Sequence, residues 1–203
     1  MTDRTNKPIH FDVLRDILDT LRFRGTMFFH SDLAAPWGVS FDPMDIPRFH
    51  IALAGRCFIG TENDHSVTFD DMEIVMIPNG SAHWIADQVG RKLTKGTQAA
   101  QACELGTPLF QSGEITNRLM CGLVQFDQSM SHPLLHSLPQ ILHFPHAQIS
   151  RSAWATAQLI DNEIQRVENN SSPIIDRLSE VLFIQLLEEH IQNGHEKIPS
   201  SPH

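Results

Sequence analysis

The chain has few charged residues, fewer basic than acidic ones, and no closely spaced pair of cysteines. Charged side chains make up only 19% of its 203 residues, and 41% of the residues are hydrophobic. This balance is typical of a globular chain and excludes disorder over most of the length. Lysine and arginine number 15 against 24 acidic residues, so the net charge is −9 at pH 7. An acidic chain repels phosphate backbones, which argues against nucleic-acid binding by bulk charge.

The cysteines and the apolar runs exclude further classes of protein. Cys57, Cys103 and Cys121 are widely spaced and include no CxxC pair, so we expect a reduced protein without a disulfide framework. The first eight residues are polar and lack the apolar core of a signal peptide. No apolar run approaches the roughly 18 residues that would span a membrane. These absences predict a cytoplasmic protein without a membrane segment.

The hydrophobic period changes along the chain. Residues 10–24 place apolar side chains at steps of three and four before Gly25, which predicts a leading helix. From Thr26 the apolar runs are short and divided by turn residues, which is typical of a β-barrel or sandwich. We expect strands at 27–29, 37–41, 49–53, 57–59, 67–69, 74–77, 83–86 and 119–126, with a hairpin tip at 62–64.

Residues 88–117 interrupt the strand pattern with small and polar residues and four glycines. A loop of about 30 residues inside a compact domain is either a functional lid or disordered. We expect a mobile segment here, and the sequence does not choose between the two. Its basic residues Arg91, Lys92 and Lys95 are either solvated or hold an anionic effector.

The C-terminal part returns to a helical period and predicts a hairpin of two helices over residues 148–193. Ser172 is expected to cap the second helix, with Pro173 in its first turn. The second helix is apolar around much of its circumference, so we expect it to pack on the barrel and on a second copy of the chain. Residues 1–9 and 194–203 are polar and predict flexible ends.

The most informative motif lies within residues 70–87, where a strand, a tight turn and a second strand follow one another. Pro78 fixes φ before the turn, Gly80 supplies a positive φ, and the returning strand carries His83 inward. This segment resembles the second motif of the cupin superfamily, which reads Gly, five residues, Pro-x-Gly, two residues, His, three residues, Asn.

Both cupin motifs depart from the superfamily pattern in this chain. Met72 stands in place of the first Gly of the second motif, and Asp87 in place of its Asn. Residues 49–55 correspond to the first motif, where His50 is the one member left of a His-x-His pair and Ala52 takes the second position. No Glu follows at the usual distance, so the metal set that the resemblance implies is half missing.

Further segments extend the resemblance over residues 10–190 in a specific order and spacing. They are 21–25, 35–39, 49–57, 77–83, 121–122, 132–139 and 176–185. Together they are similar to the N-terminal effector-binding domain of AraC-type transcription regulators. The resemblance implies a mainly β fold with flanking helices: a cupin barrel (double-stranded β-helix or jelly roll) over residues 10–147, one N-terminal helix and the C-terminal hairpin.

In that family, roughly another hundred residues with two helix-turn-helix units follow the domain. Only about ten residues follow the last predicted helix here, so we expect the DNA-binding domain to be missing from this chain. Residues 150–203 hold four basic side chains against eight acidic ones, the opposite of a recognition helix. We therefore expect no direct nucleic-acid binding. The family's helices after the barrel commonly dimerise.

Four residues are candidate ligand contacts, namely His50, His83, Trp84 and Cys121. His83 either contacts a ligand or metal or is a structural histidine bonded to a backbone carbonyl, and His50 gains a role only if it faces His83. Cys121 is either a small buried hydrophobe or a redox or electrophile sensor, which would need a lowered pKa and access. Trp84, like Trp37, either packs in the core or rim or stacks on a ligand.

We predict a cytoplasmic domain that binds a small-molecule effector in the barrel, requires no cofactor and forms a homodimer through its C-terminal helices. No catalytic motif is visible. One alternative is a metal-dependent cupin enzyme, a dioxygenase or isomerase, with His50, His83 and a third ligand on Zn, Ni or Fe. The other is a stand-alone interaction module that forms mixed dimers with a full-length regulator.

Overall fold

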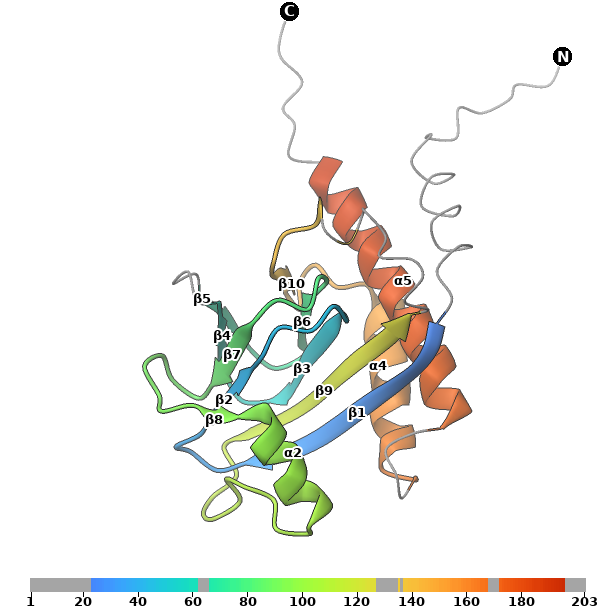
Figure 1. Cartoon of the computed structure of the whole chain (residues 1–203). Helices are drawn as coiled ribbons and strands as arrows, with labels where there is room; N and C mark the ends of the chain where they lie inside the picture. Colours follow the sequence, from blue (N-terminus) through green and yellow to red (C-terminus); the bar gives the residue numbers. More distant parts are fainter. Residues whose placement is uncertain (1–22, 62–65, 127–134, 136, 168–171, 196–203) are drawn as a thin grey trace, which may run out of the picture.

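The computed structural model describes residues 23–61, 66–126, 135, 137–167 and 172–195 (Figure 1). The elements follow in the order β1 (Phe23–Leu33), β2 (Gly38–Phe41), β3 (Arg48–Ala54), β4 (Cys57–Gly60), β5 (Ser66–Phe69), β6 (Glu73–Ile77), β7 (His83–Ala86), β8 (Thr94–Lys95), α2 (Gly96–Glu104), β9 (Asn117–Phe126), β10 (Leu142–Phe144), α4 (Arg151–Ile164) and α5 (Pro173–His195). No helix within these ranges is long and apolar enough to cross a bilayer.

The strands form two five-stranded sheets, which confirms the prediction of a mainly β fold with flanking helices. One sheet has the order β1-β9-β3-β6-β10 and the other β5-β4-β7-β2-β8. All neighbours are antiparallel except the short parallel pair β2 and β8. Most neighbouring strands are distant in the sequence, so local patterns could indicate the strands but not their partners.

Each of the eight predicted strands is present, whereas the prediction at the N-terminal boundary was wrong. The predicted leading helix lies mostly outside the described residues, but its last residues, Phe23 and Arg24, belong to β1. β1 pairs with β9 from Phe23 to Leu33, with a register shift between Phe23 and Gly25. This long antiparallel ladder outweighs the weak helical preference of two residues. The predicted hairpin tip also lies outside the described residues.

The expectation of a loop without secondary structure at 88–117 was wrong as well. β8 and α2 occupy residues 94–104 within it. α2 is built largely from small and polar residues, and none of them is fully buried. It therefore lacks the apolar stripe by which a helix is recognised in a sequence.

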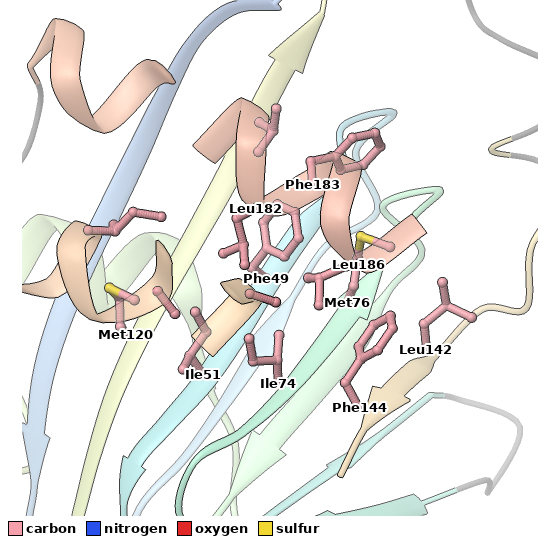
Figure 2. Packing of buried hydrophobic residues seen from close by; sticks show 14 of the residues in the cluster. Phe49, Ile51, Ile74, Met76, Met120, Leu142, Phe144, Leu182, Phe183 and Leu186 are labelled. Atoms are coloured by element: carbon pink, nitrogen blue, oxygen red, sulfur yellow. The ribbon is translucent and has the colours of Figure 1, made fainter. Parts of the chain in front are cut away.

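The C-terminal hairpin is present as predicted, with α4 and α5 covering the outer face of the first sheet (Figure 1). Ser172 caps α5, because its Oγ accepts a hydrogen bond from the backbone N–H of Ile175 at 3.2 Å. Figure 2 shows the core between helices and sheet, where Phe183 meets Phe49 edge-on at 6.1 Å. This interface holds the helices firmly against the strands that also form the barrel.

Alternation along β3 separates the two cores of the molecule. Phe49 and Ile51 face the helices and belong to the first core, whereas His50 and Ala52 face the interior between the two sheets. The second core contains Trp37, which is only 2% exposed, and other buried residues of both sheets. The interior of the barrel is therefore where ligand-binding groups are to be sought.

Candidate functional site

The turn before β7 directs His83 into the barrel, as its sequence predicted. Gly80 has φ +64°, and a Cβ at this position would lie 1.6 Å from the carbonyl oxygen of Met44. The backbone N–H of Met44 donates to the Gly80 carbonyl at 3.0 Å, so the two loops are in close contact. His83 Nδ1 in turn donates to the carbonyl of Ser81 at 2.7 Å. Glycine is required here by both the left-handed conformation and the close approach.

His50, His83 and Cys121 form one hydrogen-bonded chain inside the barrel. His50 Nε2 lies 2.9 Å from His83 Nε2, and His50 Nδ1 lies 3.1 Å from Cys121 Sγ. Because His83 Nδ1 donates to Ser81, its Nε2 accepts the proton of His50 Nε2, and His50 Nδ1 accepts the thiol proton of Cys121. Every ring nitrogen has a partner in this assignment, and all three side chains are neutral.

Burial enforces this neutral state. Desolvation lowers the pKa of His50 well below 6.5, and the neighbouring His83 and Arg48 lower it further. Desolvation also lowers the pKa of His83 to about 4 and raises the pKa of Cys121 to about 12. A thiol-based sensor needs a lowered thiol pKa, so the surroundings of Cys121 act against that role.

The geometry does not fit a transition-metal site. The two Nε2 atoms point at each other across 2.9 Å, while Cys121 approaches His50 from the opposite ring nitrogen. These three donors therefore cannot converge on one ion, and a zinc ion would need each donor within about 2.0–2.3 Å. In the described ranges, no three His, Cys, Asp or Glu side chains gather closely enough to hold a metal.

Beside the hydrogen-bonded residues His83, His50 and Cys121 lies a cavity of about 350 Å³ between β1, β9, β2, β7 and α2. Figure 1 shows α2 across one end of β1 and β9. The lining is mainly apolar and includes Phe29, Leu33, Trp37, Val39, Phe41, Ile85, Ala99, Ala100, Cys103, Leu109, Phe110, Leu119 and Cys121. Its size and lining are those of a small-molecule site.

Of the predicted site residues, Cys121 lines the cavity, and His50 and His83 lie directly behind its wall. Phe41 forms that wall, with its ring stacked on His83 at 4.8 Å and tilted against His50 at 5.3 Å. The structure places Trp84 elsewhere. Trp84 alternates with the inward-facing His83 and packs on β4, where a Cβ on Gly60 would lie 2.5 Å from its ring.

Trp37 is the tryptophan that lines the cavity, and it is held at both ends. Its indole Nε1 donates to Asn117 Oδ1 at 2.9 Å, and its backbone N–H donates to Asp87 Oδ1 at 3.2 Å. Asp87, which replaces the Asn of the cupin motif, also binds Arg91 through two hydrogen bonds. This wall of the cavity is thus fixed by residues from β9 and from the segment after β7.

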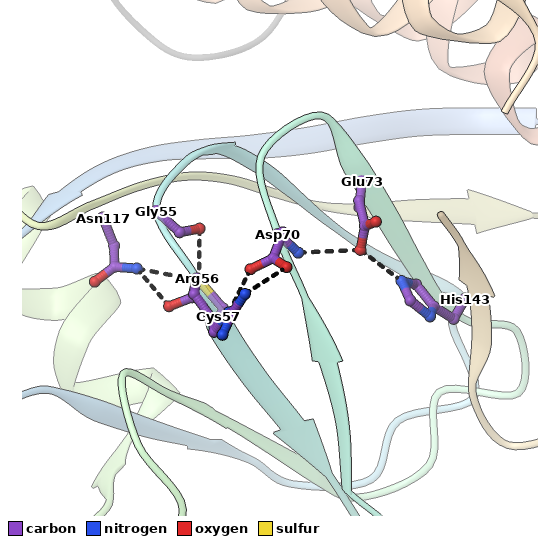
Figure 3. A network of polar contacts seen from close by, with 7 residues as sticks. All are labelled: Gly55, Arg56, Cys57, Asp70, Glu73, Asn117 and His143. Atoms are coloured by element: carbon purple, nitrogen blue, oxygen red, sulfur yellow. Dashed lines mark hydrogen bonds and ion pairs between the residues drawn. The ribbon is translucent and has the colours of Figure 1, made fainter. Parts of the chain in front are cut away.

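The polar network drawn in Figure 3 continues from Asn117 across the barrel. Asn117 Nδ2 donates to the Arg56 carbonyl at 2.8 Å, and the Arg56 guanidinium forms two hydrogen bonds to Asp70. Glu73 accepts from the backbone N–H of Asp70 and contacts His143 Nε2 at 2.8 Å. The network joins β6, β9 and β10 to the residues beside β4 and β5, and it holds Asn117, the hydrogen-bond partner of Trp37.

Sequence reasoning missed the contribution of α2 to the cavity. Gly96, Ala99, Ala100 and Cys103 all line it from this helix. Gly96 is also close to the wall, because a Cβ there would lie 3.0 Å from the ring of Phe41. Small residues repeated at steps of three and four were the available signal, but a stripe of small side chains resembles any solvated segment.

Two curated transcription regulators are similar to this chain over most of its length. The chain is 27% identical over 191 residues to the HTH-type transcriptional regulator AlkR of Acinetobacter baylyi. The match covers 89% of this chain and 61% of that protein. It is 22% identical over 192 residues to an uncharacterised HTH-type transcriptional regulator of Haemophilus influenzae, covering 90% and 60%. The chain thus spans about three fifths of the length of the curated relatives it matches.

The solved structures to which the chain is similar include ToxT of Vibrio cholerae. An apo ToxT variant has 8% identity and a TM-score of 0.48, covering 90% of this chain and 61% of that one. Wild-type ToxT bound to an unsaturated fatty acid has 11% identity and a TM-score of 0.41, covering 88% and 55%.

The sequence comparisons confirm the resemblance to AraC-type regulators that the motifs indicated. A family model described as Cupin (Cupin_6) matches residues 12–192, nearly the whole chain. The two sheets, the turn that carries His83 and the interior cavity belong within that matched range. The chain therefore belongs to the cupin family.

Proposed function

We propose that this chain is the effector-binding part of a transcription regulator and that the effector occupies the cavity between the barrel and α2. The single observation that carries the proposal is an apolar cavity of about 350 Å³ inside a cupin barrel whose relatives are helix-turn-helix regulators. DNA binding would then belong to residues outside this chain, since its C-terminal helices are acidic. Such a regulator would act in the cytoplasm.

The strands β1 and β9 supply a route from the cavity to the helices. Leu119 and Cys121 of β9 line the cavity, and Met120 between them packs in the core beneath α4 and α5 (Figure 2). A ligand that favours one position of these strands shifts the population of the helix packing on their other face. Filling the cavity thereby changes the surface that α4 and α5 present.

This surface is the proposed homodimer contact. α4 and α5 keep large apolar side chains exposed, with Leu159 at 53%, Ile174 at 54% and Val181 at 43%. Exposed apolar groups of this kind are typical of positions that a partner covers. Mixed dimers with a full-length regulator would use the same face. A metal-dependent enzyme has less support, because His50 and His83 satisfy each other.

A thermal-shift screen of small molecules with two matched variants tests the proposal. Ala99→Phe places a large ring in the cavity from α2, whereas Gln98→Phe adds the same ring at an exposed neighbouring position outside it. We expect ligands that stabilise the wild type and Gln98→Phe but not Ala99→Phe. If every stabilising ligand acts equally on both variants, the cavity is not the effector site.

A further inference from the structure

We infer that the effector is an uncharged, mainly apolar molecule of about a dozen non-hydrogen atoms, and that the cavity discriminates against carboxylates of the same size. The inference deepens the proposed function and rests on it. The size follows from a cavity of about 350 Å³ and a share of about 30 Å³ for each water-sized group. The charge follows from the direction of each ionisable side chain around the cavity.

The register of β1 and β9 turns their charged residues away from the ligand. Ser31 is opposite Leu119 and so faces the cavity, whereas Asp32 is opposite Arg118 and faces outward. Asp32 and Arg118 form an ion pair at 2.8 Å on that outer side. The ring of His30 also turns outward, with Nε2 3.5 Å from Asp161 of α4. His30 and Asp32 therefore border the cavity without directing their polar groups into it.

The basic residues of the segment 88–117 are also engaged elsewhere. Arg91 is bound by Asp87 through two hydrogen bonds, and Lys95 pairs with Asp42. Neither residue lines the cavity, nor does Lys92. In the part of the chain that the structure describes, no lysine or arginine lines the cavity, so a bound carboxylate would lose its hydration without gaining a counter-ion.

One buried cation, Arg48, lies near the cavity and is the group with which a carboxylate ligand could pair. Arg48 is only 7% exposed, and its guanidinium lies 5.4 Å from the centroid of the Phe41 ring. Its Nη2 donates to the Asp42 carbonyl at 3.0 Å, whereas Nη1 has no hydrogen-bond partner. Arg48 contacts Phe41 but does not line the cavity. A carboxylate could reach it only after Phe41 moved, which would break the stacking on His83.

The polar groups that remain in the lining are neutral. Ser31 offers a hydroxyl and Gln111 an amide. The thiol proton of Cys121 is directed to His50, so its sulfur contributes a soft apolar surface. The indole N–H of Trp37 is likewise committed to Asn117. Such a lining suits a hydrocarbon skeleton with at most one hydroxyl or carbonyl group.

Matched alcohol and carboxylate probes test the inference at pH 7.5. One pair is 2-naphthalenemethanol and 2-naphthoate, and the other is 1-decanol and decanoate below its micelle concentration. Binding is measured by calorimetry and by tryptophan fluorescence, with Ala99→Phe and Gln98→Phe as site and matched control. We expect at least one alcohol to bind about tenfold or more tightly than its carboxylate, because only the carboxylate is desolvated without a partner. Ala99→Phe should abolish this binding and Gln98→Phe should preserve it.

Carboxylates that bind as tightly as the alcohols, or more tightly, would overturn the inference. If Arg48→Met then removed that binding, Arg48 would be the counter-ion and the cavity would still be the effector site. If neither pair binds, the charge of the cavity-dependent ligands from the screen decides, and mostly ionised ligands overturn the inference. A screen that yields no cavity-dependent ligand would instead reject the proposed function itself.

Discussion

The buried histidine pair makes acid the perturbation to which this fold should be most sensitive. His83 has a pKa lowered from 6.5 to about 4 because it is desolvated, and the pKa of His50 is lowered for the same reason. The unfolded chain therefore binds more protons than the folded chain between pH 6.5 and 4, so stability falls as the pH falls through this window. Each pKa unit corresponds to about 1.4 kcal/mol.

The magnitude follows from His83 alone. Between pH 7 and pH 4.5, its lowered pKa removes roughly 2–3 kcal/mol from the free energy of unfolding, and His50 adds a loss in the same direction. This is a large part of the roughly 5–15 kcal/mol that stabilises a typical domain. The stability contribution is fully present above pH 6.5, where both rings are neutral in either state.

Urea denaturation at a series of pH values measures the effect. We expect the double variant His50→Gln and His83→Gln to lose most of this pH dependence, whatever its stability at pH 7. His146→Gln is the matched control, because His146 is exposed and its replacement should leave the pH profile unchanged. If the double variant and the wild type lose stability in parallel from pH 7 to 4.5, the histidines are not buried as a neutral pair.

Two further predictions concern a thiol and a strained residue. In the native protein, a thiol reagent should modify one cysteine first, Cys103, because Cys103 is exposed while the thiols of Cys57 and Cys121 have pKa values raised to about 12. All three should react in denaturant, Cys103→Ser should abolish the fast native reaction, and early reaction of Cys121 would contradict the raised pKa of its thiol. Met72 has φ 64°, the left-handed conformation that the Gly of the cupin motif would adopt without strain. Met72→Gly should therefore be at least as stable as the wild type in urea, because it removes a strain of about 1–2 kcal/mol that an L-residue pays in this conformation. Met72→Val should be less stable than the wild type, because a β-branched residue is disfavoured further at positive φ; equal stability of the two variants would show that this position is not strained.

Local patterns in the sequence predicted the elements with strong periodicity and the turn that carries His83. Runs of alternating or apolar residues predicted eight strands, and helical spacing predicted α4 and α5. The elements that were missed have little pattern of their own. β8 and β10 contain two and three residues, and α2 consists mainly of small and polar side chains. Such elements are held in place by contacts that no short window of sequence contains.

The parts of the site that depend on the alternation of side chains along one strand could be predicted from the sequence. The parts that depend on how distant strands pair could not. His50 was expected to matter only if it faced His83, and that contact depends on long-range pairing of β3 with β9 and the placement of β7. Trp84 follows the inward-facing His83 directly in β7. Because side chains alternate along a strand, this position alone places Trp84 on the outer face of the sheet. The role of Trp37 depended on Asn117, 80 residues away, and could not be derived locally.

The position of the effector is tested most directly by a crystal structure of the chain with the tightest ligand that the screen identifies. We predict electron density for the ligand inside the barrel, in contact with Trp37, Phe41, Cys121 and the inner side of α2. Density for the same ligand on the outer face of α4 and α5, with the cavity unchanged, would contradict the proposal that the barrel is the sensing site.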